Sequence, residues 1–323
     1  MFKRIIVPLD GGAFAEAALG AARELARMCG SRVVVVRAVA PSGLPRTVAS
    51  TDTEASFERL DEADAYLHDI VDRLRLEGID ASIVLYIAEP GTAIARAAEI
   101  DHADLIVMTA HPRWKSDFLD NSSTTLQVLA RSRIPILAWR SGAGRQAARD
   151  VLPEAMALAS MESPIVVPLD GSPFAEAALP VAEDMARRCG SYLVLVQAVP
   201  DGRIPGSDTA TLQRGAREKS SDEEVARGYL EQVKQDLATR GIGAEVIVHR
   251  GTPTHVIDAV WREQNGSLII MASHGASGVA RSFLGSVTAR TIEDVGAPVL
   301  VVRPETEIPP DPYIDARVLR IMS

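Results

Sequence analysis

Two glycines and a serine in the second half of the chain have the types and spacing of a phosphate-binding loop. Gly275 and Gly285 bracket nine residues, and Ser286 follows directly. An apolar run ends at Met271 just before them, and the residues after Ser286 read as the first turn of a helix. Free backbone N–H groups and the positive end of a helix dipole favour a phosphate at such a position. Glycine also lets the backbone approach a ligand closely.

An internal repeat supplies the elements that must position this loop. Residues 7–19 return as residues 167–179, at an offset of 160, and residues 104–108 correspond to residues 267–271, at an offset of 163. A small insertion in the middle of the second copy explains the change of offset. A unit of this length is a domain and not a solenoid repeat, so the chain is a tandem duplication.

Each copy alternates short apolar runs with longer helical patterns. The pattern predicts two tandem doubly wound α/β domains, each with a parallel sheet and helices on both faces. Their predicted limits are 1–140 and 163–304, with a linker at 141–162 and a C-terminal tail at 305–323. In copy one the predicted strands are 5–9, 32–39, 81–87, 105–109 and 135–139, and the helices are 14–28, 56–76, 92–100 and 122–130. In copy two the strands are 165–169, 192–199, 244–249, 268–272 and 299–302. A capping box that begins at Ser221 predicts the start of the long helix there.

Composition excludes several classes of protein. The 34 basic and 43 acidic residues give a net charge of −9, which argues against a nucleic-acid partner because phosphate contacts need clustered Lys and Arg. No apolar run has the roughly 18 residues of a membrane helix, and the N-terminal stretch lacks the features of a signal peptide. Two cysteines make no disulfide framework. We therefore expect a cytoplasmic protein with neither nucleic acid nor membrane as a partner.

Ligands of doubly wound sheets bind at the carboxyl ends of the strands, and the candidate residues of copy two gather there. Asp170 could accept hydrogen bonds from ribose hydroxyls, although it could instead merely cap the following helix, as could Asp10 in copy one. Arg281 is the one cation inside the loop, and His274 is expected to order the loop. The remaining candidates are Pro168, Leu169, Ala198, Met271, Ala272, Gly275, Gly285, Ser286, Val287 and Thr288.

These residues resemble the motif of the universal stress protein family, in its ATP-binding branch. That motif is Gly, two residues, Gly, nine residues, Gly and then Ser or Thr; here Ala272, Gly275, Gly285 and Ser286 occupy the four places. The resemblance extends over both copies. It implies a five-stranded parallel sheet in the order 3-2-1-4-5, of the adenine-nucleotide alpha hydrolase-like type. It also implies pairing of the two domains within the chain, and leaves a homodimer open.

The resemblance further implies a role for each matching residue. Ala198 and Met271 would line an adenine pocket, and Asp170 would meet the ribose. The phosphates of ATP, with or without Mg²⁺, would lie against Gly275, Gly285, Ser286 and Val287.

Copy one departs from the motif, because Thr109, Pro112 and Ser122 stand where the glycines would be. Pro112 lacks a backbone donor, and Asp117 and Asp120 add negative charge where phosphates would lie. We expect copy two to hold the nucleotide and copy one to serve as a folded partner.

Three functions compete at this point. The first is an ATP-binding regulatory protein of the stress response. The second is an enzyme, a slow ATPase or a nucleotidyl transferase; hydrolysis would be slow because no general base stands beside the phosphate loop. The third is an interaction scaffold that binds no nucleotide.

Overall fold

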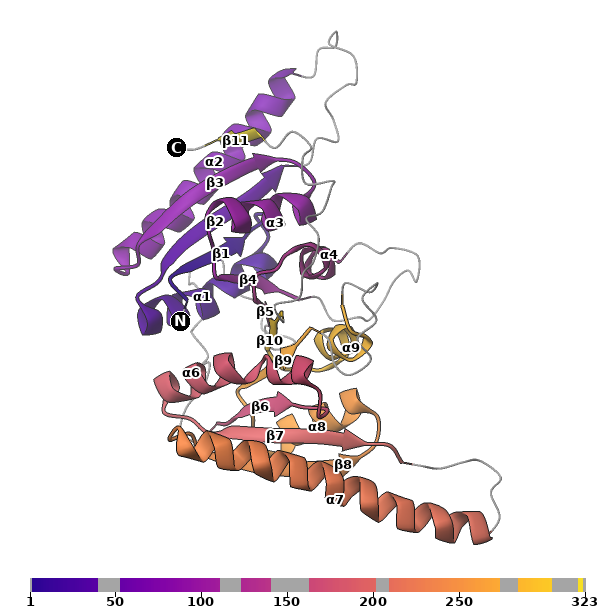
Figure 1. Ribbon diagram of the computed structural model, residues 1–323. Helices are drawn as coiled ribbons and strands as arrows, with labels where there is room; N and C mark the ends of the chain where they lie inside the picture. The colour runs from indigo at the N-terminus through magenta and orange to yellow at the C-terminus, as the bar shows by residue number, and fades with distance from the viewer. Residues whose placement is uncertain are drawn as a thin grey trace. The chain divides into compact units, whose positions relative to one another are not determined.

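The computed structural model describes residues 2–39, 53–110, 123–140, 163–201, 209–273, 284–303 and 319–321. The chain divides into two compact units (Figure 1). Unit 1 comprises Met1–Met156 together with Glu305–Ser323, and unit 2 comprises Ala157–Pro304.

Unit 1 is a parallel sheet with helices between its strands, and one antiparallel strand lies at its edge. The strand order is β11-β3-β2-β1-β4-β5. Its strands are β1 (Arg4–Pro8), β2 (Arg32–Val39), β3 (Ala81–Ile87), β4 (Leu105–Thr109), β5 (Ile136–Trp139) and β11 (Leu319–Ile321). Its helices are α1 (Ala13–Cys29), α2 (Thr53–Leu76), α3 (Pro90–Ile100) and α4 (Thr124–Arg131).

Unit 2 repeats this arrangement, with the strand order β10-β9-β6-β7-β8 and all pairings parallel. Both units therefore confirm the predicted order 3-2-1-4-5. The strands are β6 (Ile165–Pro168), β7 (Leu193–Val199), β8 (Ala244–Arg250), β9 (Leu268–Ala272) and β10 (Val299–Val302). The helices are α5 (Pro173–Glu176), α6 (Leu179–Cys189), α7 (Thr209–Thr239), α8 (Pro253–Glu263) and α9 (Ser286–Asp294).

The central strands are buried on both faces, which explains their unbroken apolar sequences. Residues 33–36 of β2 and 193–196 of β7 are all buried, as are residues 268–272 of β9. Right-handed crossovers that run in opposite directions across a sheet place their helices on opposite faces. In unit 1, α1 and α2 follow connections that run toward β3, whereas α3 and α4 follow connections that run toward β5. The two pairs of helices therefore cover opposite faces of the sheet.

The first helix of the repeat is continuous in unit 1 and broken in unit 2. Gly20 lies inside α1, whereas Pro180 occupies the corresponding place in the first turn of α6. Proline has no N–H to donate to the carbonyl four residues earlier, and its ring clashes with that carbonyl. The helix therefore stops at Glu176 and restarts at Leu179, where Pro180 occupies the first turn.

Two sequence predictions about secondary structure need correction. The long helix of unit 2 begins at Thr209 and not at the predicted capping box at Ser221. Residues 209–220 contain no proline that would interrupt a helix. They are helical, so Ser221 lies inside α7 and not at its start. Strand β11 was not predicted: it pairs antiparallel with β3, with Leu319 opposite Ile87. It adds a strand to the edge of unit 1.

An ion pair between the first and second long helices recurs in both units with its charges exchanged. In unit 1, Arg23 Nη2 lies 2.7 Å from Glu77 Oε2, and Arg27 pairs with the same carboxylate. In unit 2, Arg240 Nη2 lies 3.1 Å from Glu183 Oε1. The duplicated fold thus keeps the contact between these helices while the residue types trade places.

No helix among the described residues combines the length and the apolar character needed to cross a membrane.

Candidate functional site

Three neighbouring strands of unit 2 bring most of the predicted site residues to one edge of the sheet. Strand β6 lies between β9 and β7. It ends at Pro168, and the Leu169 N–H donates to the Val196 carbonyl at 2.9 Å. Met271 and Ala272 close β9 and are both 5% exposed, and Ala198 lies near the end of β7. The carboxyl ends of β6, β7 and β9 therefore meet where the sequence analysis expected a ligand.

The N-terminus of α9 lies at the same edge and is held there by two contacts. The Gly285 N–H donates to the Ser273 carbonyl at 2.7 Å, which joins the two ends of the predicted phosphate loop. The Thr288 hydroxyl donates to the Ala272 carbonyl at 3.0 Å. Thr288 is 2% exposed, so its side chain anchors the helix to β9. The sequence analysis missed this anchoring role.

The N-cap residue of α9 gives the first turn no side-chain cap. This residue is Gly285, and no side-chain cap hydrogen bond is formed there. An α-helix leaves its first N–H groups without partners inside the helix. Here those groups belong to Ser286, Val287 and Thr288, which are three of the predicted phosphate contacts. The Ser286 side chain is exposed beside them.

Ser172, and not Asp170, is the N-cap of α5, so the helix-capping role considered from sequence does not fall to Asp170; Asp170 instead organises the turn after β6. Its Oδ1 accepts the Ser172 N–H at 3.0 Å and the Ser172 hydroxyl at 2.6 Å. Ser172 Oγ in turn accepts the Ala175 N–H and caps α5. Asp10 plays the same part in unit 1, where its Oδ1 accepts the Gly12 N–H at 2.7 Å. Asp170 is exposed at the sheet edge, so turn formation and ligand contact are compatible.

A tyrosine and a glutamate next to this turn were missed by the sequence analysis. The Tyr229 hydroxyl donates to Glu176 Oε1 at 2.9 Å, and Tyr66 makes the same bond to Glu16 in unit 1. Burial, and then the hydrogen bond to Glu176, raise the pKa of the Tyr229 phenol above its usual 10.0; the negative charge of Asp170 adds to the rise. The phenol therefore remains a neutral donor. The signal that could have revealed the pair is its recurrence in both copies.

Three predicted residues of the loop lie outside the described residues: His274, Gly275 and Arg281. In copy one the same holds for Pro112, Asp117, Asp120 and Ser122.

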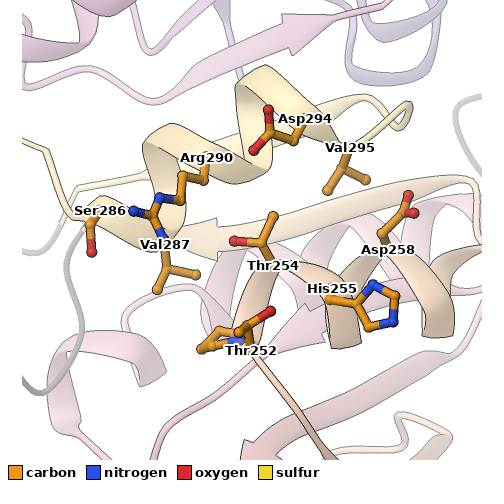
Figure 2. Close-up of a pocket in the computed structure, with 10 residues that line it drawn as sticks. Thr252, Thr254, His255, Asp258, Ser286, Val287, Arg290, Asp294 and Val295 are labelled. Atoms are coloured by element: carbon orange, nitrogen blue, oxygen red, sulfur yellow. The ribbon is translucent and has the colours of Figure 1, made fainter. Parts of the chain in front are cut away.

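A pocket of about 430 Å³ opens between α8 and α9 of unit 2 (Figure 2). Two predicted phosphate contacts, Ser286 and Val287, belong to its wall. The sequence analysis did not single out the rest of the lining, which comprises Thr252, Pro253, Thr254, His255, Asp258, Arg290, Asp294 and Val295. Among the described residues no group of three or more His, Cys, Asp or Glu side chains could hold a metal ion.

The corresponding edge of unit 1 is closed at two points. Ser123 is the N-cap of α4, and its Oγ accepts the Leu126 N–H at 3.5 Å, so the helix caps itself. Arg37 lies against the turn after β1, where a Cβ at Gly11 would stand 3.3 Å from Arg37 Nη1. The guanidinium also stacks over the Tyr66 ring, 5.3 Å from its centre.

In unit 2 the place of Arg37 is taken by Gln197, because both pair with the third strand at the same register: Arg37 with Leu85, Gln197 with Val248. Among the residues that the structure describes, none would lie within 4 Å of a Cβ at Gly171. No described side chain therefore closes the turn that carries Asp170 as Arg37 closes the turn in unit 1.

Comparisons with known proteins agree with this architecture. A solved universal stress protein from Archaeoglobus fulgidus superposes with a TM-score of 0.67 and 20% identity, over 93% of this chain and 98% of that chain. One from Pseudomonas aeruginosa gives a TM-score of 0.62 and 15% identity, over 94% of each. At these identities the likeness shows the fold.

Sequence relatives carry the same name. A universal stress protein of Mycobacterium tuberculosis is 32% identical over 144 residues, which are 44% of this chain and 45% of the relative. One from Methanocaldococcus jannaschii is 28% identical over 155 residues, 44% of this chain and 96% of the relative. The matched part thus spans about half the length of the mycobacterial relative. The sequence profile of the universal stress protein family matches residues 1–140 and 161–303, so the chain belongs to this family.

Proposed function

We propose that this universal stress protein is a regulatory protein that holds ATP, with or without Mg²⁺, at the strand edge of unit 2. The observation that carries the proposal is the first turn of α9, whose N-cap Gly285 offers no side-chain cap and which Gly285 and Thr288 hold against the end of β9. A phosphate chain laid there would receive several backbone N–H groups and the helix dipole.

Further support comes from the turn at Asp170. Its carboxylate is exposed, and it follows β6, which lies between β7 and β9; these two strands carry Ala198 and Met271, the residues that the family resemblance assigns to the adenine pocket. Unit 1 has a self-capped helix and a turn closed by Arg37, which supports a single nucleotide per chain. The predicted pairing of the domains, a homodimer and a cytoplasmic location stay predictions.

Calorimetric titration of the full chain with ATP and Mg²⁺ tests the proposal. We expect one nucleotide per chain. Gly285→Asp should abolish measurable binding, because aspartate is a good N-cap and its carboxylate would both occupy the free N–H groups and repel phosphate. Asp170→Asn should weaken binding by about tenfold or more, since a charged hydrogen bond contributes about 1.5–3 kcal/mol.

Asp10→Asn is the matched control in unit 1 and should leave binding unchanged. No binding by the wild-type chain, or full binding by Gly285→Asp, would refute the proposal. Release of phosphate should be followed in the same samples. Linear release over many turnovers that is lost in Asp170→Asn would favour the alternative, an ATPase or nucleotidyl transferase.

A further inference from the structure

The helix contact that borders the pocket between α8 and α9 has different residues from the matching contact of unit 1. At the offset of 163 residues, Thr254 stands in the place of Gly91 and Arg290 in that of Gln127. In unit 1 a Cβ at Gly91 would lie 2.5 Å from Gln127 Oε1 and 2.9 Å from Gln127 Cβ. Helices α3 and α4 are therefore in close contact where a glycine permits it, whereas Thr254 stands beside the open space of unit 2.

One end of the pocket suits an anion. The hydroxyl groups of Thr252, Thr254 and Ser286 line it, and the Arg290 side chain extends toward Ser286 and Val287 (Figure 2). Arg290 is exposed and has no ion-pair partner among the described residues. Arginine binds phosphate through two parallel N–H bonds, which makes it a strong and directional phosphate ligand.

The other end of the pocket has the opposite charge. Asp258, Asp294 and Val295 line it. Asp258 Oδ2 accepts a bond from Arg262 Nε at 2.9 Å, while its Oδ1 is buried without a hydrogen-bond partner. An anionic group would therefore be confined to the end that holds Ser286 and Arg290, because the acidic end repels it.

We propose that this end of the pocket receives the terminal phosphates of the nucleotide, and that Arg290 makes unit 2 prefer a triphosphate to a monophosphate. The inference rests on the proposed function, since Ser286 and Val287 belong to both the phosphate loop and the pocket. A monophosphate would reach only the first turn of α9. A longer phosphate chain continues into the pocket, where Arg290 and the hydroxyls of Thr252 and Thr254 meet it.

The test compares ATP with AMP by calorimetry on the full chain. Arg290→Gln gives unit 2 the residue that unit 1 already has. It should weaken ATP binding by about tenfold, as expected for loss of a charge-assisted bond, and change AMP binding by less than about twofold. Arg187→Gln removes the same charge from the exposed side of α6 and should alter neither. Circular dichroism establishes that each variant is folded.

The outcomes separate the two proposals. If the wild-type chain binds both nucleotides and Arg290→Gln weakens them equally, or weakens neither, the role of Arg290 is refuted while nucleotide binding stands. If ATP and AMP bind the wild-type chain with equal affinity, the triphosphate preference is refuted in the same way. If the wild-type chain binds neither, the proposed function fails and this inference fails with it.

Discussion

The two units share a strand order and an internal ion pair, yet the same edge of the sheet is closed in unit 1 and open in unit 2. Ser123 caps α4, whereas Gly285 leaves the first turn of α9 uncapped. Arg37 fills the space beside Gly11, whereas none of the described residues fills the space beside Gly171. Gln127 packs onto Gly91, whereas a pocket borders Thr254.

These differences lie at separate places, in a helix cap, in a strand and at a helix contact. In unit 1, side chains of the protein itself occupy the helix N–H group, the space beside the turn and the space between the helices that a phosphorylated ligand would otherwise use. Duplication of a domain thus allows the two copies to diverge at this edge, and in unit 1 the helix caps itself and the helix contact is packed more tightly. Three further experiments can break or sharpen this comparison.

The largest expected effect is at the helix contact. Gly91→Thr introduces a Cβ that would lie 2.9 Å from Gln127 Cβ, so α3 and α4 must move apart. We expect the free energy of unfolding to fall by about 2 kcal/mol, in the range of overpacked cores. Urea denaturation followed by circular dichroism measures it. The reciprocal Thr254→Gly should cost less than about 1 kcal/mol, the ordinary cost of glycine in a helix. Equal costs for the two variants would show that the helix contacts are alike.

A smaller effect is expected at the strand position that differs. Gln197→Arg should place a guanidinium beside Gly171, as Arg37 lies beside Gly11, where it would compete with ribose hydroxyls for Asp170. ATP affinity should fall by about tenfold, or ~1.4 kcal/mol. The matched Arg37→Gln variant should leave ATP affinity unchanged. Tighter binding by Gln197→Arg would mean that a cation at this position helps to hold the ligand.

The smallest effect concerns the exchanged ion pair, which tests whether the units are alike away from the ligand edge. Arg23→Glu should destabilise the chain by about 1 kcal/mol, because it puts two partly exposed carboxylates side by side. Adding Glu77→Arg should recover most of this loss, since unit 2 already has that polarity in Glu183 and Arg240. A double-mutant cycle in urea measures the coupling. Failure of the second substitution to restore stability would show that the polarity cannot be exchanged in unit 1.

Much of the fold could be predicted because its signals are local. The apolar runs gave β2, β3, β4, β9 and β10 with the bounds that the structure shows. The predicted start of α7 at Ser221 was wrong, because a capping box can start a helix only where the residues before it are not helical. Strand β11 was missed because three residues carry little pattern, and their partner β3 lies far away in the sequence.

The candidate site divides in the same way. Asp170 and Ser286 could be singled out because strand ends and helix starts are visible in the sequence. Glu176 and Tyr229 could not be paired from their spacing, since 53 residues separate them.

The sequence alone therefore determined the duplication and the loss of the motif glycines from copy one, while the strand order came from its resemblance to the family. These features depend on residue types and on spacing along the chain. Only the tertiary structure decided that Thr288 anchors α9 to β9, that Arg37 fills the turn at Gly11 and that Arg290 faces a pocket. These features depend on side chains from distant segments meeting in space, and whether such contacts close or open a site is settled by packing.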